Sequence, residues 1–101
     1  MSESAVRISD AGELLLSGVL DYRSGPVLRK QGGALIKSSS APALVVDCSA
    51  VEKSSSVGLS LLLCFMRDAQ AAGKALSIRA LPDDMREIAQ VSGLTELLAQ
   101  P

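Results

Sequence analysis

The chain has 101 residues, enough for one domain with a single hydrophobic core but not for a catalytic domain plus a regulatory one. Apolar residues make up 48% and charged residues 21%, proportions typical of globular rather than disordered proteins. Ten basic residues against eleven acidic ones leave no cationic surplus for a nucleic-acid backbone, and there is no histidine. We therefore expect a single domain, residues 1–101, that binds no nucleic acid and has neither a zinc site nor histidine-dependent catalysis.

We expect neither a secretion signal nor a membrane span in this chain. The longest nearly apolar run, residues 57–66, is about half of the roughly 20 residues that a spanning helix needs. Cys48 and Cys64 both lie in apolar stretches without an adjacent basic residue, so we expect two buried, unreactive thiols in a reducing compartment. These features predict a cytoplasmic protein with no direct insertion into a membrane.

The first half of the chain predicts a hairpin, a helix and a strand. Short apolar runs at residues 5–8 and 13–18 flank a Ser-Asp-Ala-Gly spacer, which is typical of a β-hairpin. Apolar residues then recur at helical spacing over residues 27–36, but Gly32 and Gly33 each cost about 1 kcal/mol relative to alanine. We expect that helix to be irregular or broken there. Residues 43–48 form a continuous apolar run that predicts a strand covered on both faces.

The second half predicts two further helices around one more strand. We expect a polar loop over residues 49–56, a strong helix over 57–72 that Gly73 ends, and a strand over 76–80. A helix over 85–91 follows, opened by proline and acidic residues, and then a short helix over 94–100. The order ββαβαβαα predicts an α/β fold in which helices pack on a mixed sheet with partly parallel strands.

The helix that starts at Val57 has more apolar side chains than one buried face requires. Over residues 57–66 only Gly58 and Ser60 are not apolar. Such a helix is either covered on several sides by its own domain or exposes an apolar patch that docks a partner protein. The sequence leaves both alternatives open.

Three serines, Ser54 to Ser56, directly precede this helix. Serine is a favoured N-cap, because its hydroxyl accepts a hydrogen bond from a free backbone N–H. A phosphate at the same place would meet those N–H groups, so the loop is also a candidate phosphorylation site.

The remaining polar residues do not indicate catalysis. No glycine-rich nucleotide loop of either common pattern occurs. Asp21 and Asp47 each follow an apolar strand, where we expect turn or capping carboxylates rather than catalytic acids. We therefore expect no enzymatic activity, no catalytic residue, no metal and no cofactor.

Three segments resemble the STAS-domain family, the fold of the anti-sigma-factor antagonists. An apolar strand ending at Asp47 precedes Ser55-Ser56-Val57-Gly58-Leu59, which is similar to the family pattern D-[ST]-x-G-[LVI]. Residues 16–21 resemble the family's L-x-G-x-L-D turn, and residues 87–94 resemble its helix followed by Ser-Gly-Leu. The resemblance implies a STAS fold over nearly the whole chain.

Within the family, the chain length and the Leu-Ser-Leu-Leu-Leu run from Leu59 resemble the MlaB group. These are cytoplasmic subunits of the Mla phospholipid-transport ABC complexes of Gram-negative bacteria. The resemblance implies an accessory subunit that binds and supports an MlaF-like ATPase, and through it contacts the permease, at the inner membrane. Such a complex maintains the lipid asymmetry of the outer membrane.

The resemblance also implies where the partner binds. It aligns the family's important hydroxyl with Ser56, but Ser55 replaces the carboxylate that usually precedes it, which favours constitutive binding over a phosphorylation switch. The alternative is an anti-sigma-factor antagonist regulated by phosphorylation at Ser56. We expect the partner-binding surface to comprise Ser54, Ser55, Ser56, Val57, Leu59, Ser60 and Leu63.

Overall fold

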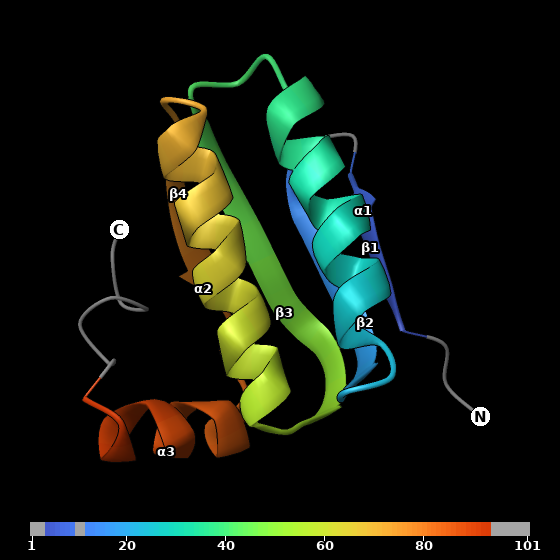
Figure 1. Ribbon diagram of the computed structural model, residues 1–101, viewed down its shortest axis with the longest axis vertical. Helices are drawn as coiled ribbons and strands as arrows, with labels where there is room; N and C mark the ends of the chain where they lie inside the picture. Colours follow the sequence, from blue (N-terminus) through green and yellow to red (C-terminus); the bar gives the residue numbers. More distant parts are fainter. Residues whose placement is uncertain (1–3, 10–11, 94–101) are drawn as a thin grey trace.

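The computed structural model describes residues 4–9 and 12–93, and Figure 1 shows the arrangement of the elements. In chain order they are β1 (Ala5–Ile8), β2 (Leu14–Leu20), α1 (Gly25–Ser38), β3 (Ala43–Ser54), α2 (Ser56–Ala71), β4 (Ala75–Arg79) and α3 (Asp83–Val91). The sheet order is β1-β2-β3-β4, with β1 antiparallel to β2 and the other neighbours parallel. This confirms the predicted mixed α/β fold, while the helix expected over 94–100 lies outside the described residues.

Two helices cover one face of this sheet. In Figure 1, α1 and α2 lie side by side in front of the strands and run in the same direction, whereas α3 lies across the lower end, beside the start of α2. Because each parallel crossover returns the chain along a helix, α1 begins where β2 ends and α2 begins where β3 ends. The first turns of both helices therefore share one end of the molecule.

The core lies between the sheet and these two helices. Burial alternates along β2 and along the first half of β3, with one side chain pointing inward and the next only half-buried. This is the pattern of strands packed on one face, so the expectation that residues 43–48 are equally covered on both faces was wrong. Leucines dominate the fully buried side chains, which include Leu14, Leu16, Leu20, Leu28, Ile36, Leu62, Phe65 and Met85.

β3 is longer than the sequence indicates. It continues to Ser54, so most of the loop expected over residues 49–56 is strand, and α2 begins at Ser56. Backbone pairing with β2 explains the difference, because Ala50, Val51, Lys53 and Ser54 each face a β2 residue in the parallel ladder. Such pairing uses main-chain groups and tolerates the polar side chains that the sequence reading took as a loop.

α1 continues through its two central glycines, contrary to the expected break. A Cβ at Gly32 would overlap the ring of Phe65, and a Cβ at Gly25 would lie 2.8 Å from Val57 Cγ1. Both glycines therefore face α2, where the missing side chains let the two helices approach. Burial of the fully covered Phe65 offsets the intrinsic cost of glycine in the helix.

The opposite face of the sheet carries an ion cluster centred on Arg79. Its guanidinium donates to both carboxylate oxygens of Glu13 at 2.7 Å and to Asp47 Oδ2 at 2.8 Å. Asp47 lies inside β3 and not at a turn, which corrects the expectation for this residue, and its Oδ1 accepts from the N–H of Ser49. The hydrogen bonds from Arg79 and Ser49 lower the pKa of Asp47 to about 2.

Candidate docking site

The turn between β2 and α1 is fixed by Asp21, as expected for a turn carboxylate. Its Oδ1 accepts from the backbone N–H groups of Ser24 and Arg23 at 3.0 and 2.9 Å, and these hydrogen bonds lower the pKa of Asp21. Ser24 Oγ in turn donates to the carbonyl of Val19 at 2.9 Å. Gly18, with φ of +87°, lies at a register shift against β3 just before this turn. The L-x-G-x-L-D segment thus sets where α1 starts.

The three serines before α2 make three different sets of contacts. Ser55 is the N-cap: its Oγ accepts from Val57 N–H at 3.1 Å and lies 3.3 Å from the Leu20 carbonyl, to which it donates. Ser54 Oγ donates to the Ser55 carbonyl at 3.0 Å. Ser56, the first residue of α2, is exposed, and within the described residues its hydroxyl has no hydrogen-bond partner. The cap role predicted for one serine therefore belongs to Ser55, which leaves the Ser56 hydroxyl facing solvent.

The structure does not present all seven predicted partner-binding residues at the surface. Ser55, Ser56 and Ser60 are exposed, and Ser54, Val57 and Leu63 are half-buried. Leu59 is only 4% exposed and belongs to the core, so it supports the surface from beneath. Most of the apolar surplus of α2 is thus covered by its own domain, as the first of the two alternatives predicted.

An apolar groove of about 290 Å³ lies between the first turns of α1 and α2. It is lined by Gly25, Pro26, Arg29, Val57, Ser60, Leu61 and Cys64. Sequence reasoning named Val57 and Ser60 of this lining but missed Leu61, Cys64 and the α1 side, for which the Gly25-Pro26 helix start was the available signal. The groove adds a concave apolar surface beside the exposed serines.

The two cysteines differ in exposure, although both were expected to be buried. Cys48 is 1% exposed in the core, and its burial raises the pKa of the thiol to about 12. Cys64 is half-buried and lines the groove. Only Cys48 therefore matches the expected inert thiol.

Two exposed side chains near the same end were also missed. Tyr22, in the turn before α1, is 71% exposed, and Val27, in the first turn of α1, is 56% exposed. The guanidinium of Arg23 lies 5.6 Å from the centroid of the Tyr22 ring. An exposed aromatic beside a cation is a common component of protein interfaces, so this corner extends the candidate surface toward α1.

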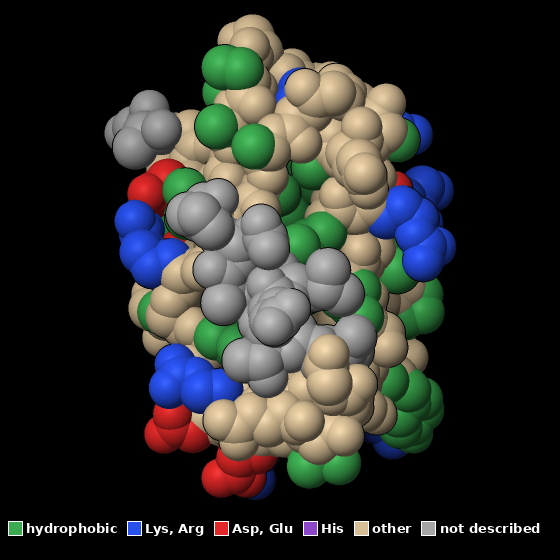
Figure 2. All heavy atoms as spheres, turned by 90° about the vertical axis from the view of Figure 1, so that its left-hand side faces the viewer, with side chains coloured by type: hydrophobic (Ala, Val, Ile, Leu, Met, Phe, Trp, Pro, Cys, Tyr) green, Lys and Arg blue, Asp and Glu red, His purple; other side chains and the backbone are tan. Residues whose placement is uncertain are grey.

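α3 borders the site on its other side. Met85 and Ala89 are buried and anchor the helix, and Asp84 Oδ2 accepts from the Ser54 backbone N–H at 3.2 Å. Asp83 and Glu87 are exposed, and Figure 2 shows acidic side chains at the lower end of this side of the molecule. α3 thus positions the serine loop through one carboxylate and presents acidic groups beside it.

This arrangement has the chemistry of a binding surface. Within residues 4–9 and 12–93, no three His, Cys, Asp or Glu side chains group in a way that could hold a metal ion. No helix in that part of the chain has the length and apolarity to cross a membrane. What the described residues do offer is an exposed hydroxyl at a helix start beside an apolar groove.

A four-stranded sheet with one antiparallel edge, two parallel crossover helices and a serine-capped α2 defines a STAS domain. The chain belongs to the STAS family described as "Mlab, STAS domain", whose profile matches residues 4–99. No curated protein is significantly similar to the chain in sequence.

Solved structures of two kinds resemble the chain. One is a chain of the Acinetobacter MlaFEDB complex in its ATP-bound Vtrans2 conformation, with a TM-score of 0.82 and 25% identity over 96% of this chain and 99% of that one. Another is an anti-sigma factor antagonist from Mycobacterium paratuberculosis, with a TM-score of 0.74 and 29% identity over 95% and 81%. The unphosphorylated anti-sigma factor antagonist SpoIIAA has a TM-score of 0.73 and 17% identity over 97% and 86%, which shows the shared fold.

Proposed function

We propose that this chain is a non-enzymatic accessory subunit of an Mla-type ABC phospholipid transporter. In this proposal it binds the MlaF-like ATPase, supports its assembly and activity, and contacts the permease through it at the inner membrane. The observation that carries the proposal is the MlaB family match together with the likeness to a chain of an MlaFEDB complex, which spans nearly the full length of both chains. Transport by such a complex would maintain the lipid asymmetry of the outer membrane.

The proposed contact is the docking end, which we define as Ser54 to Val57, Ser60, Leu63 and the apolar groove. Its support is local geometry. Three hydrogen bonds hold Ser54 and Ser55, so this segment is ordered before a partner binds. Binding therefore costs it little conformational entropy. The exposed Ser56 hydroxyl stands beside half-buried apolar side chains, a mixture of rim and core features found at interfaces.

Ser56→Arg tests this contact, because it places a long charged side chain at the centre of the docking end. Ser40→Arg is the matched control, since Ser40 is also exposed but lies in the α1–β3 loop at the opposite end of the molecule. Both proteins are expressed with a tag at native level, and the copurifying ATPase and permease are quantified by mass spectrometry. We expect Ser56→Arg to lose the ATPase, by at least tenfold, and Ser40→Arg to retain it.

Thermal unfolding of both variants separates lost binding from lost folding. Ser56 is exposed, so its variant is expected to unfold within a few degrees of the parent chain. Retention of the ATPase by Ser56→Arg would refute the proposed surface. Purification of the parent chain without any ABC ATPase would refute the transporter function itself.

A second candidate function is an anti-sigma-factor antagonist switched by phosphorylation at Ser56. The observation in its favour is the 29% identity to the mycobacterial antagonist, together with the exposed hydroxyl at a helix start. Against it, the N-cap is Ser55 rather than a carboxylate. Intact-mass analysis of the chain from native cells tests it: a phosphate adduct that Ser56→Ala abolishes is expected of a switch, and an unmodified chain under all growth conditions argues against one.

A further inference from the structure

A second, polar stretch of groove runs along α1, beside Asp68 of α2, and adjoins the apolar one. It has a volume of about 420 Å³ and is lined by Pro26, Arg29, Lys30, Gly33, Ala34, Lys37 and Asp68. The surface of α1 is recessed there because Gly33 and Ala34 have little or no side chain. A Cβ at Gly33 would lie 3.1 Å from Asp68 Oδ2. Pro26 and Arg29 line both stretches, so the two adjoin at these residues, and we call them together the α1–α2 groove.

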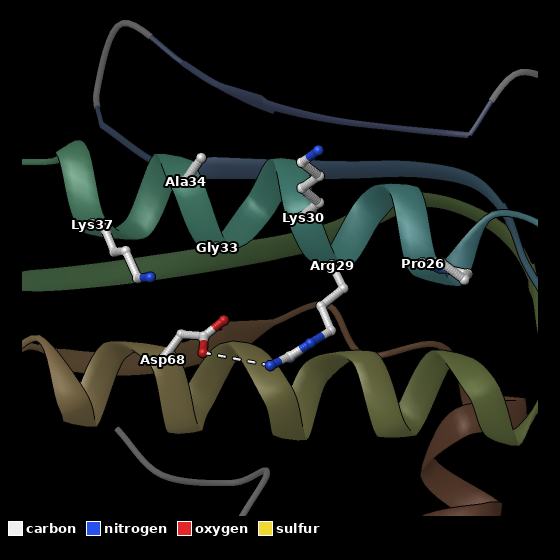
Figure 3. Close-up of a pocket in the computed structure, with 7 residues that line it drawn as sticks. All are labelled: Pro26, Arg29, Lys30, Gly33, Ala34, Lys37 and Asp68. Carbon is white, nitrogen blue, oxygen red and sulfur yellow. Dashed lines mark ion pairs between the residues drawn. The ribbon is translucent and has the colours of Figure 1, made fainter.

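The polar stretch is cationic. Between Tyr22 and Val46 the chain has four basic residues and no acidic one, and three of the four line this stretch. Asp68 is the sole carboxylate in the lining, and it is 3.9 Å from Arg29. Within the described residues neither Lys30 nor Lys37 has an ion-pair partner. Figure 3 shows Arg29 and Lys37 extending toward α2, while Lys30 points away from α2.

The shape of the groove suits a peptide. The distance from Pro26 to Lys37 is about 17 Å at about 1.5 Å per helical residue, a length that about five residues of extended chain would span. At Gly33 and Asp68 the lining is formed where α1 meets α2. One end is apolar and the other is cationic, so a bound segment needs different side chains at its two ends.

We propose that the α1–α2 groove binds an extended acidic segment of a partner protein. An apolar residue of that segment occupies the end lined by Val57, Leu61 and Cys64, and its carboxylates pair with Arg29 and Lys37. Charge complementarity selects this occupant, because a cationic groove in a chain of net charge −1 attracts acidic sequences and repels basic ones. The inference extends the proposed function: the apolar end is shared with the docking end, and the cationic stretch along α1 adds a contact with its own recognition chemistry.

The groove contains its own reporter for the test. Cys64 lines the apolar end and is half-buried, whereas Cys48 is fully buried with a strongly raised pKa and reacts slowly. The rate at which iodoacetamide alkylates Cys64 in the full chain therefore reports whether the groove is occupied. The probe is the acetylated hexapeptide Leu-Ala-Glu-Asp-Glu-Glu, and the control peptide has lysine at each acidic position.

We expect the acidic peptide to slow Cys64 alkylation at least threefold and the basic peptide to have no effect. Protection should weaken as salt is raised, because exposed ion pairs are screened. Lys37→Glu should abolish protection and Lys37→Gln, which removes charge without adding an acid near the helix end, should weaken it. Lys53→Glu, an equal charge change at an exposed residue of β3, should leave protection intact.

Several outcomes would overturn the inference. Equal protection by both peptides, or none at millimolar acidic peptide, shows that the groove does not select acidic segments. Protection by inorganic phosphate or by phosphatidylglycerol vesicles, but not by the peptide, assigns the cations to a free phosphate or to a lipid headgroup. Dimers in gel filtration that dissociate at high salt, and that do not form with Lys37→Glu, would show that these cationic side chains bind a second copy of the chain.

The test separates the groove from the Ser56 contact with the ATPase. Ser56 does not line the groove, so Ser56→Arg should retain protection by the peptide even when it has lost the ATPase. Failure of the peptide with retained ATPase binding rejects the groove alone. Protection by the peptide without any ATPase partner rejects the proposed function alone.

Discussion

Ser55 and Ser56 are chemically identical neighbours that the fold uses differently. Ser55 accepts from Val57 N–H and donates to the Leu20 carbonyl, so it joins the start of α2 to the end of β2. Ser56 makes no such contact within the described residues and faces solvent. Ser55 therefore serves structure, and Ser56 is free to serve recognition.

This division predicts different effects for substitutions at the two serines. Ser55→Ala removes the N-cap and should lower the free energy of unfolding by about 1 kcal/mol. Ser55→Asp should recover only part of this loss, because aspartate is an equally good cap but cannot donate to the Leu20 carbonyl. Ser56→Ala should change it by less than about 0.5 kcal/mol. Urea unfolding with an unchanged m-value measures all three, and equal losses at both serines would contradict the assignment.

At the scale of elements, the decisive contact is between α1 and α2. Gly25 and Gly32 face Val57 and Phe65 across a gap too narrow for a Cβ, while Gly33 faces Asp68 with slightly more room. The close approach of the helices buries Phe65 completely against Gly32. At the surface it leaves the groove that Gly33 lines. The same glycines thus determine both packing and surface shape.

Gly32→Ala is the sharpest test of this packing. In an exposed helix the substitution would raise stability by about 1 kcal/mol, because alanine has the higher helix propensity. Here we expect a loss of about 1–3 kcal/mol, since the new methyl group overlaps the Phe65 ring. Thermal and urea unfolding measure the sign, and Gly32→Ala combined with Phe65→Leu should recover part of the loss. A stabilised single variant would show that the helices are not in close contact there.

The elements differ in how well the sequence predicts them, for physical reasons. The hairpin and α2 follow from local periodicity and turn residues, and their positions were found to within a few residues. The end of β3 and the continuity of α1 depend on partners far along the chain: β2 for the polar half of β3, and Phe65 for Gly32. The serine loop was predictable from capping chemistry, but the groove beside it was not, because two helices form it jointly.

At the scale of the whole molecule, the ion cluster around Arg79 connects three segments that are far apart in the sequence. Arg79 at the end of β4 holds Asp47 of β3 and Glu13 just before β2. Asp47 is 14% exposed and Arg79 is 52% exposed, so water screens the pairs in part. The cluster therefore contributes chiefly to the pH dependence of stability.

Acid unfolding should show this contribution. The pKa of Asp47 falls from its ordinary 3.8 to about 2 in the folded chain, so the folded state binds fewer protons than the unfolded state in that interval. The stabilisation is present above about pH 4 and is lost as the pH falls through about 2. Asp47→Asn should flatten the decline in unfolding temperature between those values, whereas Glu52→Gln, at an exposed residue later in β3, should leave it unchanged. Identical pH profiles for Asp47→Asn and the parent chain would refute the role of the cluster.

The parallel crossovers also sort the loops of the molecule into two groups. The β2–α1 and β3–α2 connections, with their serines, lie at one end, and the α1–β3 and α2–β4 connections lie at the other (Figure 1). A fluorophore or short affinity tag inserted near Ser40 would then stand about a helix length, roughly 20 Å, from the docking end. The architecture therefore gives the experimenter an attachment point far from the serines before α2.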